Sequence, residues 1–407
     1  MAPNGRAFPD GFWWGTGASS TQCEGSAPMS DWRRGEDRGS LPPSGDGNGF
    51  ATRFADDFKI LAGLGLTHHR LSIEWARIEP LEGQRDAAAI EHYRAVLRAA
   101  RDAGISPWVC LHHFTLPVWF TKIGAGGFRD DRARSTYWAR HVAFCAATFG
   151  DLVFGWKPIN EPFAYAAAYL LGEYPPRRDP KKMLDAYRGV LLAQRDAWRE
   201  LRGAGKPVAT IHNLSPLFPA DASVAAQHNT AAVDELMWQV WVRADREGVL
   251  ALPGRPPEVV PDLRECGDLI GFSYYCAHAV TRDLTFAPYP SDARVGPLGY
   301  TPWSEGLALV IRRLADELPG RPIVVCEHGV GTDDDGWRRE ILASSLGHVA
   351  AAIGDGIDVR GFFHWTAVDN YEWQHGFSVS FGILDRDRTP RGSAELLAEV
   401  ARPTPRE

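Results

Sequence analysis

The chain has 407 residues, with 44 Lys and Arg against 51 Asp and Glu and a formal net charge of −7. A chain of this length can bury one large core, and α/β barrels commonly use this much sequence as a single domain. The excess of acidic residues excludes sequence-independent binding of nucleic acid, which needs a basic surface. We therefore expect a globular protein with no nucleic-acid partner.

Neither a targeting segment nor a membrane partner is predicted. Residues 1–17 lack a basic start followed by an apolar run and a cleavage site. The longest apolar stretch, residues 164–171, is far shorter than the roughly 20 residues that span a bilayer. The six cysteines are scattered without a CxxC pair, which is typical of reduced, buried thiols. These features favour a cytoplasmic protein.

Short β-branched or aromatic runs alternate along the chain with amphipathic helical patterns. The strand-like runs cover residues 12–18, 67–75, 106–114, 153–160, 208–214, 269–276, 322–327 and 361–368. Apolar stripes at helical spacing lie between them: Phe54, Phe58 and Leu61; Ile90, Tyr93, Leu97 and Ala100; Trp337, Ile341 and Ser345. Residues 35–49 and 286–301 are predicted to form long surface loops.

Eight strands that alternate with helices indicate parallel pairing and a closed barrel. A doubly wound open sheet is the structural alternative, and it usually carries a glycine-rich phosphate turn after its first strand. Here Gly15 and Gly17 lie in the first run, but no helix begins there and no third glycine completes that fingerprint. No linker interrupts the alternation, so we predict an α/β fold in which residues 1–407 form a single (β/α)8-barrel domain.

Two glutamates end predicted strands. Glu161 follows the fourth run and precedes Pro162, which disfavours the helical region, so we expect Glu161 to have extended backbone. Glu327 ends the seventh run, whose apolar residues should lie in the barrel wall. The carboxyl ends of the strands form the mouth where such barrels perform chemistry. Two carboxyl groups facing across that mouth suit glycoside hydrolysis, in which one protonates the leaving oxygen and the other attacks the anomeric carbon.

Seven motifs in chain order resemble those of glycoside hydrolase family 1. Residues 156–162, Trp-Lys-Pro-Ile-Asn-Glu-Pro, resemble the Asn-Glu-Pro acid/base motif of that family. Residues 325–329, Val-Cys-Glu-His-Gly, are similar to its Thr-Glu-Asn-Gly nucleophile motif. The likeness covers nearly the whole chain. It implies a (β/α)8 barrel with Glu161 as acid/base and Glu327 as the nucleophile of a retaining mechanism.

The same resemblance implies further site residues. The substrate-binding residues are expected to be Gln22, His113, Asn160, Trp365, Glu372 and Trp373. Arg70 and Tyr275 are expected to support the nucleophile, Arg70 by keeping it ionised and Tyr275 by a hydrogen bond. Each of these residues also has a structural explanation when taken alone, such as core packing for Trp365. It is the combination that favours a sugar site.

Four positions depart from the family pattern. Phe114 stands where tryptophan is usual, Pro158 where threonine is common, His328 in place of asparagine and Ser273 in place of asparagine. None of these changes removes a catalytic carboxyl group. Phe114 and Ser273 remove hydrogen-bonding partners near the sugar, which leaves the glycone open. The chain is also shorter than many members, and a trimmed rim would suit a bulky aglycone.

No metal or other cofactor is predicted. His68 and His69 are adjacent on a predicted strand, as are His112 and His113, so the side chains of each pair point to opposite faces. Phospho-β-glycosidases resemble this family but use a cation near the last strand to hold a 6-phosphate. Residues 379–381, Val-Ser-Phe, supply no cation, and the negative charge of Glu372 would repel phosphate.

The resemblance implies an exo-acting retaining β-glycosidase that takes a small-molecule β-glycoside. A β-glucosidase that tolerates galactosyl or fucosyl groups fits best. A transglycosylase would use the same residues with an alcohol acceptor in place of water, and the sequence does not separate the two. A non-catalytic sugar-binding relative is disfavoured because both glutamates are present. Nothing in the sequence indicates the oligomeric state.

Overall fold

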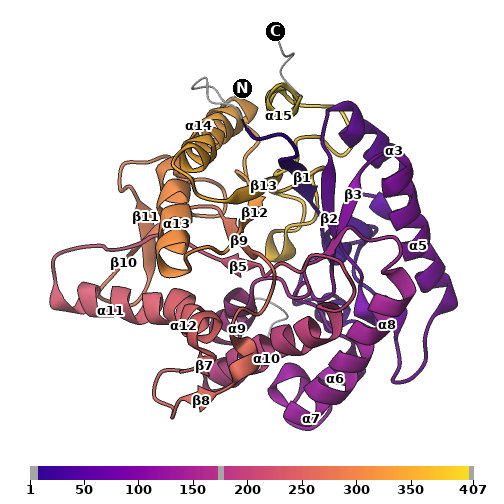
Figure 1. The fold of residues 1–407 in the computed structure, drawn as a ribbon, viewed down its shortest axis with the longest axis horizontal. Coiled ribbons are helices and arrows are strands. Elements are labelled where there is room, and N and C mark those ends of the chain that lie inside the picture. The colour runs from indigo at the N-terminus through magenta and orange to yellow at the C-terminus, as the bar shows by residue number, and fades with distance from the viewer. Residues whose placement is uncertain (1–7, 173–177, 403–407) are drawn as a thin grey trace.

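The protein is a closed barrel of parallel strands ringed by helices (Figure 1). A computed structural model describes residues 8–172 and 178–402. Eight strands follow one another around the barrel in the order β4-β3-β2-β1-β13-β12-β9-β5, and neighbours pair in parallel. A parallel bridge between Trp156 and Val208 joins the two edges and closes the sheet. The predicted eight-stranded barrel is confirmed, and the open doubly wound sheet is excluded.

Six of the eight barrel strands fall within the predicted runs, whereas the seventh extends one residue past its run, to His328, and the eighth begins two residues before its run, at Val359. Their bounds are β1 (Trp13–Gly17), β2 (His68–Ser72), β3 (Ser106–Cys110), β4 (Gly155–Trp156), β5 (His212–Asn213), β9 (Ile270–Tyr274), β12 (Ile323–His328) and β13 (Val359–His364). The fourth and fifth strands are much shorter than predicted. Pro158 has no backbone N–H to donate, and beyond Trp156 the fourth run pairs only through an isolated bridge at Ile159.

The helices form the outer ring. The longer ones are α3 (Phe50–Gly63), α5 (Ala87–Asp102), α8 (Ala139–Phe149), α9 (Pro162–Leu171), α10 (Met183–Leu201), α11 (Val224–Asp234), α12 (Val240–Glu247), α13 (Ser304–Glu317), α14 (Asp335–Gly354) and α15 (Gly392–Ala401). Short helices α1 (Ser20–Glu24), α2 (Asp31–Asp37), α4 (Trp75–Ile78), α6 (Val118–Thr121) and α7 (Asp131–Ala133) follow the strands or precede the longer helices. The three predicted stripes lie on α3, α5 and α14, as expected.

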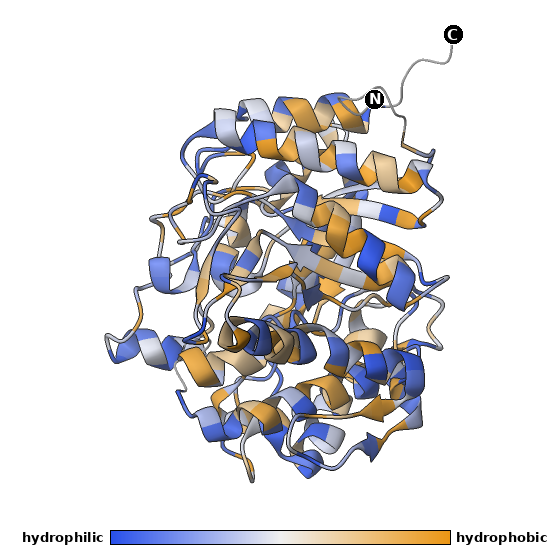
Figure 2. Ribbon diagram, turned by 90° about the vertical axis from the view of Figure 1, so that its left-hand side faces the viewer, coloured by the Kyte–Doolittle hydropathy of each residue, from blue (hydrophilic) through white to orange (hydrophobic). Residues whose placement is uncertain are grey.

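Local sequence sets where these helices begin and which face they bury. The Asp86 carboxylate accepts hydrogen bonds from the backbone N–H groups of Ala88 and Ala89 at 2.8 and 3.0 Å, which caps α5. The side of α5 that packs inward carries Tyr93 and Leu97, both fully buried. In Figure 2 the outer helices show hydrophilic and hydrophobic residues side by side, as amphipathic helices should.

Glycines on the strands make room for large side chains inside the barrel. A Cβ atom at Gly155 would lie 2.5 Å from the Trp108 ring, and one at Gly15 would lie 2.5 Å from the Phe363 ring. Trp108 and Phe363 belong to a buried cluster with Val324 and Cys326 that is separate from the main core. Because these residues come from β3, β13 and β12, the cluster fills the barrel interior beneath the mouth.

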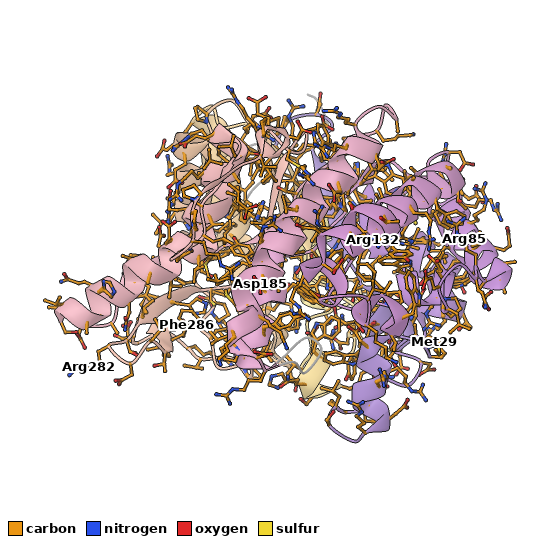
Figure 3. The ribbon with its side chains drawn as sticks, turned by 90° about the horizontal axis from the view of Figure 1, so that it is seen from below. Met29, Arg85, Arg132, Asp185, Arg282 and Phe286 are labelled. Carbon is orange, nitrogen blue, oxygen red and sulfur yellow. The ribbon has the colours of Figure 1, made fainter. Side chains whose placement is uncertain are left out.

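The two predicted loops are only partly loops. The first residues of the segment 35–49 belong to α2, and Ser44 and Asn48 are buried within it. In the segment 286–301, β11 (Phe286–Tyr289) pairs antiparallel with β10 (Ala277–Val280). Together with β6 (Leu217–Pro219) these strands form a small second sheet, whose hairpin end lies where Figure 3 labels Arg282 and Phe286. A third sheet pairs β7 (Val249–Leu250) with β8 (Glu258–Val259).

All six cysteines are free and buried. Burial raises the pKa of each thiol, to about 12 for Cys23 and Cys276 and to about 11 for Cys110. None of the helices in the described ranges is both long and apolar enough to cross a membrane. A buried bidentate ion pair between Arg388 and Asp57, at 2.8 and 3.0 Å, ties the C-terminal segment to α3.

Candidate active site

A pocket of about 270 Å³ opens at the carboxyl ends of the barrel strands. Such a volume is at the small end of the range for ligand sites and suits one sugar ring with the beginning of an aglycone. Nine of the ten site residues predicted from the sequence line it: Gln22, His113, Asn160, Glu161, Tyr275, Glu327, Trp365, Glu372 and Trp373. The tenth, Arg70, lies just beneath and contacts three of them.

Glu327 is held at both of its carboxylate oxygens. Its Oε1 forms an ion pair with Arg70 Nη2, and its Oε2 accepts a hydrogen bond of 2.6 Å from the Tyr275 hydroxyl. Burial and the adjacent negative charge of Glu327 raise the pKa of Tyr275 well above its ordinary value, so the phenol stays a donor. These two contacts stabilise the ionised carboxylate and fix its orientation.

Arg70 joins the elements of the site. It extends from β2, is fully buried, and donates through Nη1 to Asn160 Oδ1 at 2.9 Å and to His113 Nδ1 at 3.3 Å. Burial disfavours its charge, but the negative charge of Glu327 outweighs this effect and raises the pKa of Arg70. Because an arginine can only donate, His113 Nδ1 is the acceptor and its proton lies on Nε2.

The His113 ring is neutral. Burial and then the Arg70 charge lower its pKa well below the ordinary value. The ring lies parallel to those of Trp365 and Trp373, with centroids 5.8 and 6.0 Å away and interplanar angles of 11°. His113 can therefore offer a single Nε2–H donor to a ligand in the pocket.

Glu161 differs from Glu327 in its surroundings. Burial and then the negative charge of Glu327 raise its pKa to about 8, while Ser273 and Arg70 oppose the shift less strongly. The carboxyl group is therefore protonated at neutral pH. The prediction of extended backbone at Glu161 was wrong, since its φ of 47° and ψ of 70° are left-handed. Pro162 excludes the right-handed helical region, and the turn from the strand into α9 selects the left-handed one instead.

Three residues of the site share this unusual backbone. Phe114, Glu161 and Trp373 have φ values of 71°, 47° and 51°. Left-handed conformations are costly for residues with a side chain, and they persist where the surrounding structure imposes them. The Trp373 ring is packed edge-on against Trp32, with centroids 4.7 Å apart, and against Phe114 at 5.6 Å. The pocket is thus preorganised by packing around its aromatic wall.

Gln22 and Glu372 come from the segments that follow the first and last barrel strands, and both line the pocket. Gln22 is on α1, where its Oε1 accepts from Ser19 Oγ at 2.7 Å and its Nε2 donates to the Tyr371 carbonyl at 2.9 Å. Each end of the amide keeps one further hydrogen-bonding position. Burial raises the pKa of Glu372 to about 8, and its Oε1 accepts from Trp365 Nε1 at 3.3 Å.

The protonated state of Glu372 weakens its predicted repulsion of a 6-phosphate. At pH 7 and below the Glu372 carboxyl group is mostly uncharged, so charge repulsion of a phosphate operates mainly at alkaline pH. The absence of a cation still disfavours a phosphate, because none of the described residues that line the pocket is a lysine or an arginine.

Of the residues that depart from the family pattern, Phe114 and Ser273 line the pocket, whereas His328 does not. His328 turns away from the pocket, and its Nε2 pairs with Ser345 Oγ of α14 at 2.8 Å. Phe114 is buried and packs on His113, with centroids 4.9 Å apart. Ser273 lies on β9 and lines the pocket beside Glu161.

Several pocket residues were not predicted. They are Asn213, Leu214, Ser215, Cys276, His278, Leu298, Tyr300 and Phe381. Asn213 lies one residue before the end of a predicted strand, and that position could have drawn attention to it. Leu298, Tyr300 and Phe381 come from loops without periodicity, so no local pattern marks them.

The side chains of His68 and His69 point to opposite sides of the barrel wall. His68 packs on Phe154 and Phe363 inside the barrel, whereas His69 packs on Phe58 outside it. Within the described ranges no group of three His, Cys, Asp or Glu side chains is arranged to hold a metal ion.

A (β/α)8 barrel whose mouth holds one protonated and one ion-paired carboxyl group, among aromatic and amide side chains, defines a glycoside hydrolase. The sequence comparison agrees: residues 4–404 match the model of Glycosyl hydrolase family 1, and the chain belongs to this family.

Similarity to known proteins extends over nearly the whole chain. The chain is 27% identical over 420 residues to Beta-glucosidase A of Thermotoga maritima, covering 94% of this chain and 93% of that protein. It is 26% identical over 461 residues to 6-phospho-beta-glucosidase GmuD of Bacillus subtilis, covering 97% of each. The structure of a beta-glycosidase from Pyrococcus horikoshii superposes with a TM-score of 0.90 at 31% identity, over 99% of this chain and 96% of that one.

Proposed function

We propose that this chain is a retaining exo-β-glycosidase, with Glu327 as the nucleophile and Glu161 as the acid/base. The observation that carries this proposal is the contrast between the two carboxyl groups. Arg70 and Tyr275 pair with the two carboxylate oxygens of Glu327, whereas burial and the adjacent charge raise the pKa of Glu161 to about 8. Environments that separate two carboxyl groups in this way assign their roles as nucleophile and acid.

In the first step, a Glu327 carboxylate oxygen attacks the anomeric carbon while the Glu161 carboxyl protonates the glycosidic oxygen. The aglycone leaves as an alcohol and the sugar stays bound to Glu327 through an ester. The negative charge of Glu327 is one cause of the raised pKa of Glu161. Esterification removes that charge, so the pKa of Glu161 falls and the residue becomes a base.

In the second step, Glu161 takes a proton from a water molecule, and the oxygen of that water attacks the anomeric carbon. The bond to Glu327 breaks and its carboxylate is restored, with net retention of configuration. An alcohol in place of water would give a transglycosylation product by the same route.

The glycone is held by groups that match sugar hydroxyls. Asn160 Nδ2 is buried and has no hydrogen-bond partner among the described residues, so it is placed to donate to the 2-hydroxyl. Gln22 and His113 supply further positions for the neighbouring hydroxyls, while Glu372 and Trp373 bind the far edge of the ring. The indole of Trp365 lies beneath as a platform. We propose glucose as the preferred sugar, with tolerance for galactose and fucose.

The wall beyond the glycone suits an apolar or aromatic aglycone. Leu214, Leu298 and Tyr300 line it, and burial lowers the pKa of His278 there to about 4, so this ring is neutral at physiological pH. An aryl glucoside should therefore be a better substrate than a disaccharide. Equal catalytic efficiency on the two would contradict this part of the proposal.

The test is hydrolysis of nitrophenyl β-glycosides by the wild-type chain and by Glu327→Ala and Glu161→Ala. Glucoside, galactoside, fucoside, xyloside and 6-phosphoglucoside form the panel, and Glu200→Ala, an exposed position on α10, is the matched control. Activity should be lost in the Glu327 variant and kept in the control. A 2-fluoroglycoside should add one sugar mass to the peptide that contains Glu327.

Labelling of any other residue, or inversion at the anomeric centre, would refute the proposed mechanism. A 6-phosphoglucoside that is cleaved faster than the glucoside would refute the proposed glycone. Added alcohol measures how the glycosyl-enzyme divides between hydrolysis and transfer.

A further inference from the structure

Lys157 has a setting that the catalytic steps above leave unexplained. It lies between β4 and Glu161, inside the barrel, and its side chain is completely buried. Its Nζ has no hydrogen-bonded oxygen or nitrogen partner among the described residues, and it interacts instead with the weakly accepting sulfur of Cys326. A buried ammonium without a carboxylate partner is among the most costly groups a protein can place in its interior.

The surroundings of Lys157 suit a cation. Its Nζ lies 3.8 Å from the centroid of the Phe363 ring and 4.9 Å from that of Trp108. The negative faces of aromatic rings stabilise a cation, and more strongly when water is excluded. Both rings belong to the interior cluster that also contains Cys326, the residue before Glu327. Lys157 therefore lies within the layer of the barrel directly under the nucleophile.

Several ionisable groups face Lys157 from the surrounding strands. They are His68 and Arg70 on β2, Cys110 on β3, and Cys326 and Glu327 on β12. Burial makes His68 neutral, with a pKa of about 3, and raises the pKa of both thiols. Burial lowers the pKa of Lys157 and the Arg70 charge adds to this effect, whereas Cys326 and Glu327 oppose it. Arg70 and Lys157 are the basic side chains of this set that face the Glu327 carboxyl group.

We propose that Lys157 is a positioning residue for the nucleophile. Its buried ammonium, held on the faces of Phe363 and Trp108, adds a second positive charge beneath Glu327. That charge keeps the carboxylate ionised in more acidic solution than Arg70 alone would. This inference rests on the proposed function of Glu327. A lysine is suited to this place because it delivers a compact charge on a flexible stem without competing with Arg70 for the carboxylate oxygens.

The proposal is tested with Lys157→Met, which keeps the length of the side chain and removes its charge. Lys59→Met is the matched control, because Lys59 is exposed on α3 and its replacement changes the net charge equally. The pH dependence of kcat/KM on a nitrophenyl β-glucoside is measured for all three proteins. The acidic limb reports ionisation of the nucleophile in the free enzyme.

In Lys157→Met the acidic limb should move to higher pH by about half a unit, so that kcat/KM on that limb falls about threefold below that of wild type. The midpoint of thermal unfolding should stay the same or rise, since a buried unpaired charge is removed. Lys157→Gln, which is polar and neutral, should shift the limb in the same direction. Lys59→Met should superimpose on wild type.

An acidic limb that does not move in either Lys157 variant would overturn the proposal. So would loss of folding in both variants, since the lysine would then be structural. Failure of the proposed function gives a different result, because wild-type protein would then cleave no β-glycoside at any pH.

Discussion

Replacing Glu161 by glutamine tests the assignment of the catalytic acid most directly. Glutamine keeps the size of the side chain but has no proton to give. In the folded protein the pKa of Glu161 is raised to about 8 by burial and by the charge of Glu327. At pH 7 roughly nine tenths of the molecules therefore carry the acid in its protonated form.

The expected loss depends on the leaving group. General acid catalysis contributes about 10² to 10⁴ in rate, so kcat/KM for an alkyl glucoside should fall by that factor in Glu161→Gln. A dinitrophenyl glucoside needs no protonation to depart, and its kcat/KM should change far less. For the alkyl glucoside, activity of the wild-type enzyme should fall about tenfold per pH unit above pH 8, as the acid is lost.

The assay is a pH profile of kcat/KM for both substrates in the wild type, Glu161→Gln and Glu372→Gln. The last variant is needed because the pKa of Glu372 is also raised to about 8. We expect the alkaline limb to vanish in Glu161→Gln and to remain, at lower activity, in Glu372→Gln. An alkaline limb that survives in Glu161→Gln, or an equal loss for both leaving groups, would refute the reasoning.

Three further predictions follow from the site. Arg70→Met should reduce kcat/KM by about 10³ or more, and it should lower the free energy of unfolding by about 3–5 kcal/mol, because it leaves the Glu327 carboxylate buried without the Arg70 cation. Urea denaturation measures the second effect, and an unchanged midpoint would count against a stabilising Arg70–Glu327 ion pair. The pKa values of Glu161 and Glu372 are raised from 4.5 to about 8, so the folded state keeps two protons that the unfolded chain loses. Stability should therefore fall as pH rises through this window, by up to about 1.4 kcal/mol per pH unit for each group, and the double glutamine variant should flatten the slope. Excess chelator should leave the hydrolysis rate unchanged, and a loss restored by one added divalent metal would show that a cofactor had been missed.

The barrel could be predicted because most of its strands have a recognisable local sequence pattern. Runs such as 106–114 are apolar and bounded by helical patterns, so their existence and order follow from periodicity. The small sheet was not predicted, because the segment Phe286–Tyr289 contains Pro288 and its sequence is typical of a loop. Since β11 is an edge strand of its sheet, a residue without an N–H donor is tolerated there.

The site was predictable where motifs mark the residues, and less so where tertiary packing decides. Gln22 and Trp365 are 343 positions apart in the sequence, yet both line one pocket. Their pairing came from the family resemblance and not from local pattern. The left-handed backbone of Glu161 and the state of Glu372 depend on neighbours brought together only by folding. The same holds for Leu298 and Tyr300, which reach the pocket from an irregular segment.

The six buried thiols have a practical consequence. A thiol reagent reacts with the thiolate, and in the folded protein burial hides each sulfur and keeps it protonated. Modification of the native protein would therefore report transient opening, with each cysteine acting as a probe at a known place. Cys145 on α8 would follow the outer ring, while Cys110 and Cys326 would follow the barrel interior. A ligand that occupies the pocket should slow labelling of the interior pair more than that of Cys145, which would give a readout of binding without an added chromophore.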